Sequence, residues 1–177
     1  MDKDLLDAAT RLSAALLEQR QVIVTAESCT GGWVGQVLTA IAGSSAWYDR
    51  GFITYSNEAK HDMLGVPMQT IEGYGAVSVE TAEAMARGAL AHSRGTLALA
   101  ITGVAGPSGG TERNPVGTVC FAWARRPGGG RNHSVGAGID CTSARTHLDG
   151  DRERVRYQAV RIALDGALRS VGGSVES

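Results

Sequence analysis

The chain has 177 residues, of which 43% are hydrophobic and 20% charged, and its formal net charge at pH 7 is −1. These proportions are those of a soluble globular protein, and the near-neutral charge gives no field that favours nucleic acid or an anionic membrane. The length suits one domain over residues 1–177, and no apolar run approaches the ~20 residues needed to span a bilayer.

Cysteine usage and the first residues indicate a cytoplasmic protein. Cys29, Cys120 and Cys141 are odd in number, widely spaced and without a C-x-x-C pair. This spacing argues against both a disulfide framework and a zinc site, and it favours a reducing compartment. The N-terminal residues also lack the charged-then-apolar pattern of a signal peptide.

In the first half of the chain, hydrophobic spacing predicts helices that alternate with strands. The first predicted strand runs directly into the sequence E-S-C-T-G-G at 27–32. Asn57 is the predicted N-cap of the third helix. The predicted elements are a helix over 3–19, a strand over 22–26, a helix over 30–42, a strand over 51–56 and a helix over 58–64.

In the second half, a long alanine-rich helix with Ser78 as its N-cap leads to a buried strand and a glycine-rich loop. The segment 138–150 shows no clear pattern, so no element is predicted for it. The predicted elements are a helix over 79–93, strands over 96–102, 117–125 and 132–137, a tight turn over 127–130 and a helix over 151–171. Together these elements predict the α/β class, as a three-layer α/β/α fold with a mixed, mainly parallel sheet.

Three loops follow the first three predicted strands, at 27–32, 55–60 and 103–111. If these strands are parallel, all three loops open at the same edge of the sheet, where ligands bind in such folds. We therefore expect the functional site at that edge. The start of the helix after the first loop would also offer unpaired N–H groups to an anion or oxyanion.

The motifs that the chain lacks exclude several kinds of site. The glycine-rich loop carries no lysine of the G-x-x-x-x-G-K-[ST] type, and G-x-G-x-x-G is absent. The histidines show no H-E-x-x-H or other ligand spacing, so we expect no metal and no cofactor. Ser28 lies outside a G-x-S-x-G motif, and none of the three loops supplies a histidine as its base.

The same loops contain a different base, Lys60. Lysine can deprotonate a serine when burial lowers its pKa, and Tyr55 could relay a proton or orient the Ser28 hydroxyl. Cys29 is a rival nucleophile, because a thiol near a helix N-terminus is readily activated. The non-catalytic alternative is a capping serine, a packed tyrosine and a solvated lysine. These residues alone leave both interpretations open.

Eight stretches, in chain order, resemble one known family. They are T-A-E-S-C-T-G-G (25–32), G-S-S-A-W (43–47), Y-S-N-E-A-K (55–60), L-G-V-P (64–67), G-A-V-S (75–78), A-I-T-G-V-A-G-P-S-G-G-T (100–111), P-V-G-T-V (115–119) and G-D-R (150–152). They are similar to the CinA C-terminal domain family of nicotinamide-nucleotide amidohydrolases, and they cover almost the whole chain. Longer family members carry an additional N-terminal domain of molybdopterin-binding type, so this chain resembles the stand-alone form.

The resemblance implies an enzyme that hydrolyses nicotinamide mononucleotide to nicotinic acid mononucleotide and ammonia, in pyridine nucleotide salvage. By motif, Ser28 would be the nucleophile, activated by Lys60 and Tyr55. N–H groups of residues 29–31 or 102–106 would stabilise the oxyanion, and the guanidinium of Arg152 would bind the 5′-phosphate. The substrate-binding residues implied in this way are Cys29, Thr30, Gly31, Asn57, Thr102, Gly103, Gly106 and Arg152.

Two departures from the family pattern concern the region before G-D-R. Residues 137–147 form a longer stretch than the usual strand there, and Asn114 stands where a lysine often precedes P-V-G-T.

The basic cluster at 152–156 is typical of a solvated helix face.

The family name supports a second hypothesis, a non-catalytic nucleotide-binding or protein-interaction domain linked to competence or DNA damage. For the enzyme, the expected partners are a small pyridine nucleotide and further copies of the chain in a homo-oligomer, with no membrane and no nucleic acid.

Overall fold

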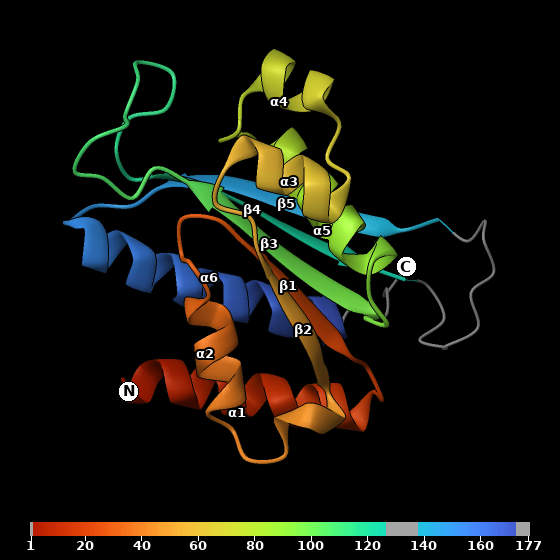
Figure 1. The fold of residues 1–177 in the computed structure, drawn as a ribbon. Coiled ribbons are helices and arrows are strands. Elements are labelled where there is room, and N and C mark those ends of the chain that lie inside the picture. The colour runs from red at the N-terminus through yellow and green to blue at the C-terminus, as the bar shows by residue number, and fades with distance from the viewer. Residues whose placement is uncertain (1, 127–137, 173–177) are drawn as a thin grey trace, which may run out of the picture.

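A mixed five-stranded sheet forms the centre of the computed structural model, which describes residues 2–126 and 138–172 (Figure 1). Its strands are β1 (Ile23–Glu27), β2 (Tyr48–Ile53), β3 (Leu97–Gly103), β4 (Thr118–Arg125) and β5 (Asp140–His147). They lie in the order β2-β1-β3-β4-β5. β1 pairs in parallel with β2 and β3, whereas β4 is antiparallel to both β3 and β5. Four strands therefore point the same way, and β4 is reversed.

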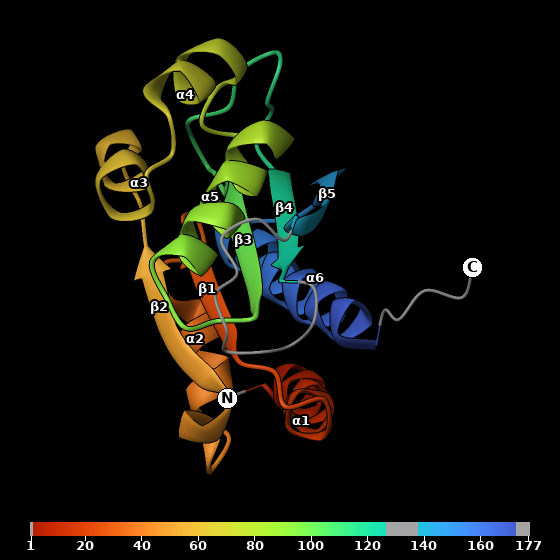
Figure 2. The ribbon, with the colours of Figure 1, turned by 90° about the vertical axis from the view of Figure 1, so that its right-hand side faces the viewer.

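Helices cover both faces of this sheet. They are α1 (Lys3–Glu18), α2 (Trp33–Thr39), α3 (Asn57–Leu64), α4 (Met68–Tyr74), α5 (Val79–Ala91) and α6 (Arg152–Gly172). α1, α2 and α6 lie on one face and α3, α4 and α5 on the other, as Figures 1 and 2 show. The predicted three-layer α/β/α fold with a mixed, mainly parallel sheet is confirmed.

The two faces of β3 belong to different hydrophobic clusters. Leu97, Leu99 and Ile101 pack with α1, α2 and α6, whereas Ala98 and Ala100 pack with α5 on the opposite face. This division follows from the strand, in which successive side chains point to opposite faces of the sheet. A strand buried on both faces in this way reads as a continuous apolar run, which is why its position could be predicted.

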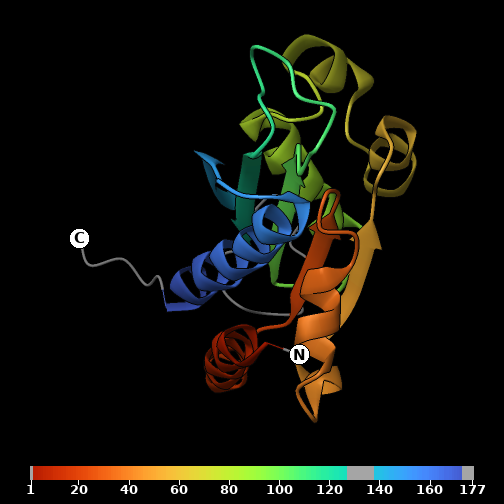
Figure 3. The same cartoon turned by 90° about the vertical axis from the view of Figure 1, so that its left-hand side faces the viewer.

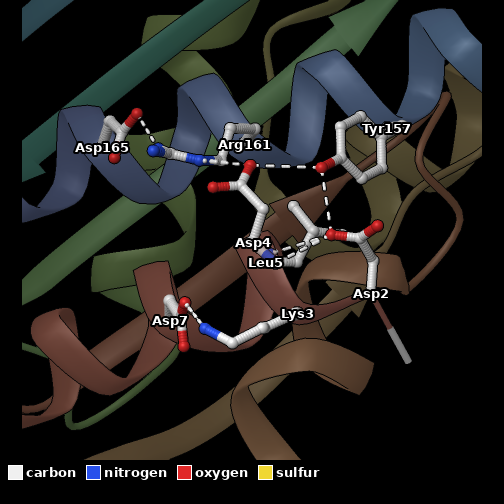
Figure 4. Close-up of polar contacts among 8 residues, drawn as sticks. All are labelled: Asp2, Lys3, Asp4, Leu5, Asp7, Tyr157, Arg161 and Asp165. Carbon is white, nitrogen blue, oxygen red and sulfur yellow. Dashed lines mark hydrogen bonds and ion pairs between the residues drawn. The ribbon is translucent and has the colours of Figure 1, made fainter.

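The N-terminal end of α1 is tied to α6 by a polar network (Figure 4). The Tyr157 hydroxyl lies 3.1 Å from both Asp2 Oδ1 and Asp4 Oδ2, which share its single hydrogen, and Arg161 Nε lies 2.9 Å from Asp4 Oδ2. Asp2 also caps α1 by accepting a hydrogen bond from the Asp4 N–H at 2.9 Å. Exposed ion pairs add little stability singly, so the main effect here is to align α1 along α6.

Several predicted boundaries are wrong. α2 begins at Trp33 rather than at residue 30, because Gly31 and Gly32 both have positive φ and the helix cannot start before them. β2 begins three residues earlier than predicted. Asp49, a poor strand former, is accommodated there because its carboxylate accepts the Arg94 N–H at 3.1 Å and pairs with Arg50.

The N-cap of α3 is Ser56 and not Asn57, since the Ser56 hydroxyl accepts the Ala59 N–H at 3.0 Å. α4 was not predicted. It is short and buries only Ile71 fully, so its hydrophobic period is too weak to detect. The predicted turn at 127–130 and strand at 132–137 lie outside the described residues, and β5 occupies part of the segment for which no element was predicted. Within residues 2–126 and 138–172, no helix has the length and apolar character needed to cross a bilayer.

Candidate active site

The carboxyl ends of β1, β2 and β3 meet at one edge of the sheet, as predicted for three parallel strands. Ser28 directly follows β1. Its N–H donates to the Ile101 carbonyl of β3 at 3.0 Å, and the Thr54 N–H donates to the Glu27 carbonyl at 2.8 Å. Both neighbouring strands thus hold the backbone where the serine emerges. Figure 3 shows this end of β1 beside the start of α6.

The structure brings Ser28 and Lys60 together from different loops. Lys60 Nζ lies 3.1 Å from Ser28 Oγ, and Lys60 and Ser28 are only 1% and 7% exposed. The same amine donates to the Thr54 carbonyl at 2.9 Å and lies 3.4 Å from the Ser56 carbonyl. α3 starts immediately after these carbonyls, so its first turn returns the lysine to the end of β1.

The surroundings of Lys60 favour its neutral form. Burial lowers the pKa of the Lys60 ammonium, and negative charge at Cys29 or Glu58 would only partly oppose this effect. A neutral amine has two N–H groups for the two backbone carbonyls and one lone pair for the Ser28 hydroxyl. The geometry therefore suits a general base that receives the serine proton.

Tyr55 lies near this pair but makes its polar contact elsewhere. Its side chain is 61% exposed, and its hydroxyl accepts a hydrogen bond from Arg152 Nη2 at 3.0 Å. Arg152 Nη1 donates to the Gly106 carbonyl at 2.7 Å. In the described part of the chain, Tyr55 has no hydrogen bond to Ser28 or Lys60. The structure therefore joins Tyr55 to Arg152 and the glycine-rich loop instead.

Glu27 has a structural role that the sequence did not reveal. Its carboxylate is 1% exposed and accepts the Thr30 hydroxyl at 2.7 Å. It also accepts three backbone N–H groups at the start of α2, at 3.0 to 3.1 Å, from Gly32, Val34 and Gly35. The expectation of unpaired N–H groups is therefore wrong for Gly32, Val34 and Gly35, because the chain's own carboxylate occupies them.

The turn after Ser28 is held by a residue from α6. Arg156 donates from Nε to the Cys29 carbonyl at 3.1 Å and from Nη2 to the Thr30 carbonyl at 2.8 Å. The Gly31 N–H donates to the Ser28 carbonyl at 3.0 Å, so it is not free for an oxyanion. Arg156 is thus not part of a solvated helix face, and its sequence separation of more than 120 residues hid the contact.

Cys29 lies next to Ser28, but its side chain belongs to the hydrophobic core. It is 6% exposed and packs within the cluster under α1, α2 and α6. Burial raises the pKa of the Cys29 thiol to about 11, so the thiol stays protonated near neutral pH. These surroundings disfavour the rival nucleophile.

The other predicted site residues differ in how far they are buried at the carboxyl-terminal edge of the sheet. Thr102 is buried and donates its hydroxyl to the Ala76 carbonyl at 2.7 Å. Gly103 has no room for a side chain, since a Cβ there would lie 2.8 Å from the Thr118 carbonyl. Gly106 has a φ of 82°, which favours glycine. Asn57 is exposed at the first position of α3.

A hollow of about 490 Å³ opens beside the turn after Ser28. It is lined by Gly31, Gly32, Trp33, Gln36, Arg152, Glu153 and Arg156. The two guanidinium groups make this hollow suited to an anionic group. Within the described ranges, no group of three or more histidine, cysteine, aspartate or glutamate side chains could hold a metal ion.

The chain is similar to known proteins along almost its whole length. The profile of the CinA C-terminal domain matches residues 6–171. The nicotinamide-nucleotide amidohydrolase PncC of Escherichia coli strain K12 is 47% identical over 163 residues, which is 92% of each chain. PncC of Pseudomonas putida is 47% identical over 161 residues, or 91% of this chain and 93% of that protein.

A similar solved structure is the competence/damage inducible protein CihA from Agrobacterium tumefaciens. It superimposes with a TM-score of 0.84 at 40% identity, over 97% of this chain and 98% of that one. With a profile match and relatives of this similarity over nearly their full lengths, the chain belongs to the CinA C-terminal domain family.

Proposed function

We propose that this protein hydrolyses the carboxamide of nicotinamide mononucleotide, giving nicotinic acid mononucleotide and ammonia, in pyridine nucleotide salvage. The relatives named nicotinamide-nucleotide amidohydrolase support the reaction and substrate class. The structural observation that carries the proposal is the buried Lys60 amine 3.1 Å from the Ser28 hydroxyl.

In the first half-reaction, Ser28 Oγ attacks the carboxamide carbon and its proton passes to the neutral Lys60 amine. The carbonyl oxygen becomes an oxyanion, for which the N–H groups of Cys29 and Thr30 are the proposed donors. Lys60 then transfers its proton to the amide nitrogen. The carbon–nitrogen bond breaks, ammonia leaves, and an ester on Ser28 remains.

In the second half-reaction, water attacks the ester carbon and gives a proton to Lys60. The same N–H groups stabilise the second oxyanion. The carbon–oxygen bond to Ser28 then breaks, and Lys60 returns the proton to Oγ. Nicotinic acid mononucleotide leaves, so that the net reaction consumes one water for each amide.

For substrate binding, we propose that Arg152 takes the 5′-phosphate at the hollow that it lines. The hydrogen bond between Tyr55 and Arg152 supports a role for Tyr55 in placing that guanidinium. A proton relay through Tyr55 would require its hydroxyl to turn toward Lys60 when substrate binds. Asn57, Thr102, Gly103 and Gly106 complete the proposed walls of the pocket.

We further propose a cytoplasmic enzyme that works as a homo-oligomer. The three cysteines are free thiols, which suits a reducing compartment. Sedimentation of the purified protein at several concentrations would measure the assembly directly.

An ammonia-release assay tests the proposed function. The purified protein is given nicotinamide mononucleotide, nicotinamide riboside or the dinucleotide, and the acid product is identified by chromatography. We expect turnover of the mononucleotide, with the riboside weaker because it lacks the phosphate. Tight binding of the mononucleotide without any product would instead favour the non-catalytic nucleotide-binding hypothesis.

A further inference from the structure

Arg156 contacts the turn after Ser28. The reaction proposed above gives these contacts no role. The Arg156 guanidinium joins two consecutive carbonyls, those of Cys29 and Thr30. It also lies over the Trp33 ring, 5.2 Å from the ring centroid. The side chain is half-buried, and these contacts on two sides hold the guanidinium in one orientation.

Two hydrogen bonds in this turn, one of them from Arg156, fix the direction of two peptide groups. In a trans peptide the carbonyl and the N–H point in opposite directions within one plane. The Ser28 carbonyl is held by the Gly31 N–H, which sets the direction of the Cys29 N–H. The Cys29 carbonyl is held by Arg156 Nε, which sets the direction of the Thr30 N–H.

In the described part of the chain, the Cys29 and Thr30 N–H groups have no hydrogen-bond acceptor. Neither the Cys29 nor the Thr30 N–H donates a hydrogen bond there, whereas the next amide, that of Gly31, does. The opposite side of the turn is anchored as well, because the Thr30 hydroxyl donates to the buried Glu27 carboxylate at 2.7 Å. The turn is therefore restrained on its carbonyl side with two donors left available.

We propose that Arg156 is a positioning residue that holds the Thr30 amide in the direction required to stabilise the oxyanion formed at Ser28, beside the Cys29 amide that the Gly31 N–H holds in place. This inference rests on the proposed amidohydrolase function. Arginine is needed because its planar fork serves both carbonyls at once, whereas a lysine amine is a single point charge. The guanidinium of Arg156 acts through the backbone and does not itself touch the reacting atoms.

The steady-state kinetics of Arg156→Ala and Arg156→Lys on nicotinamide mononucleotide test this role. Removing one oxyanion donor typically lowers kcat by about 100-fold or more, so we expect a loss of about that size in both variants, with KM changed less than about threefold. Millimolar guanidinium should restore part of the kcat of Arg156→Ala. Arg154→Ala is the matched control, since Arg154 lies on the same helix and packs over Tyr157, and it should keep wild-type kcat and KM.

Other kinetic outcomes would overturn the proposal. A raised KM with unchanged kcat would make Arg156 a substrate-binding group of the hollow that it lines. Unchanged kcat and KM would remove it from the reaction. Thermal melts establish that each variant is folded, and Arg156→Lys serves where Arg156→Ala does not fold.

A crystal structure of the Arg156 variant separates this proposal from the proposed function. We expect the Cys29–Thr30 peptide to turn once its carbonyl loses the guanidinium, and an unmoved peptide would contradict the positioning role whatever the substrate. Failure of the wild-type protein to release ammonia from nicotinamide mononucleotide would refute the function, while leaving the structural comparison to decide the role of Arg156.

Discussion

Lys60 combines two properties that rarely occur in one lysine. Its side chain is almost fully buried, and its amine meets two backbone carbonyls and a serine hydroxyl. Burial disfavours the ammonium form, so the residue that would be a solvated cation on the surface becomes a base next to Ser28.

Activity should rise with pH as Lys60 loses its proton. Only the neutral amine can accept the Ser28 proton, and burial places the pKa of Lys60 below the 10.5 of an ordinary lysine. We expect kcat/KM, measured from about pH 5 to about pH 10, to increase and then reach a plateau above that lowered pKa. Activity that still rises without a plateau at about pH 10, or activity that falls over this range, would contradict a neutral Lys60.

Lys60→Met should make the protein inactive but more stable at neutral pH. Unfolded Lys60 titrates at 10.5 and folded Lys60 below it, so between these values the unfolded state binds more protons and stability rises with pH. Below the folded pKa, the cost of burying the ammonium is present in full. The variant avoids this cost, and we expect a gain of about 1 kcal/mol or more.

Denaturant unfolding of Lys60→Met and wild type at several pH values measures that gain. The difference between the two proteins should shrink as pH rises toward 10.5, because the wild-type lysine then becomes neutral in both states. A variant that is less stable than wild type at neutral pH would show that the amine contributes more through its hydrogen bonds than burial costs.

At the scale of elements, the first turns of α2 and α3 position the two reacting side chains, Ser28 and Lys60. Ser28 is followed by a turn that leads into α2, whose first N–H groups bind the Glu27 carboxylate. α3 begins at the carbonyls that hold Lys60, and the side chain that caps it is that of Ser56. The stability of these caps therefore determines how well the two reacting side chains are aligned.

Ser56→Ala and Asn57→Ala distinguish the observed N-cap of α3 from the predicted one. Loss of the Ser56 hydroxyl leaves the Ala59 N–H without its partner, and we expect a cost of about 1 kcal/mol in unfolding free energy. Asn57 is exposed within the helix, so its replacement should change stability by less than about 0.5 kcal/mol. Thermal or urea unfolding gives both values, and equal costs would show that the Ser56 contact does not cap the helix.

At the scale of the whole molecule, the site depends on layers that the sequence predicted and on long-range contacts that it did not. A buried strand ending at E-S-C-T-G-G was enough to predict Ser28 at a sheet edge, and parallel strands brought Lys60 to it. Arg156 escaped prediction because a basic residue on a helix looks the same whether it faces water or a distant carbonyl. Glu27 escaped because nothing in its neighbours marks a carboxylate as buried.

β5 shows why the last part of the sheet could not be predicted. Its residues are mostly exposed, so no alternation of apolar and polar side chains marks it as a strand. Its place is set by pairing with β4, in a register that joins Thr118 to His147. Pairing of this kind depends on the folded sheet and not on the local sequence.

Gly88→Ala tests whether packing between helices positions the site. A Cβ at Gly88 would collide with the Leu64 carbonyl at the end of α3, whereas a Cβ at Gly73 in α4 would meet nothing within 4 Å. Because α3 carries Lys60, we expect Gly88→Ala to cost about 1 to 3 kcal/mol and to lower kcat. Gly73→Ala should be neutral or slightly stabilising. Unfolding and turnover measured on both variants decide this, and a Gly88→Ala variant with wild-type stability would contradict the close packing.

Ammonia release from nicotinamide mononucleotide by Ser28→Ala and Cys29→Ala tests most directly whether Ser28 is the nucleophile of an amidohydrolase. With folding verified by thermal melts, we predict that Ser28→Ala loses at least about 10⁴-fold in kcat, while Cys29→Ala keeps its turnover because the thiol is buried and protonated. Turnover retained by folded Ser28→Ala, or lost in folded Cys29→Ala, would contradict the account.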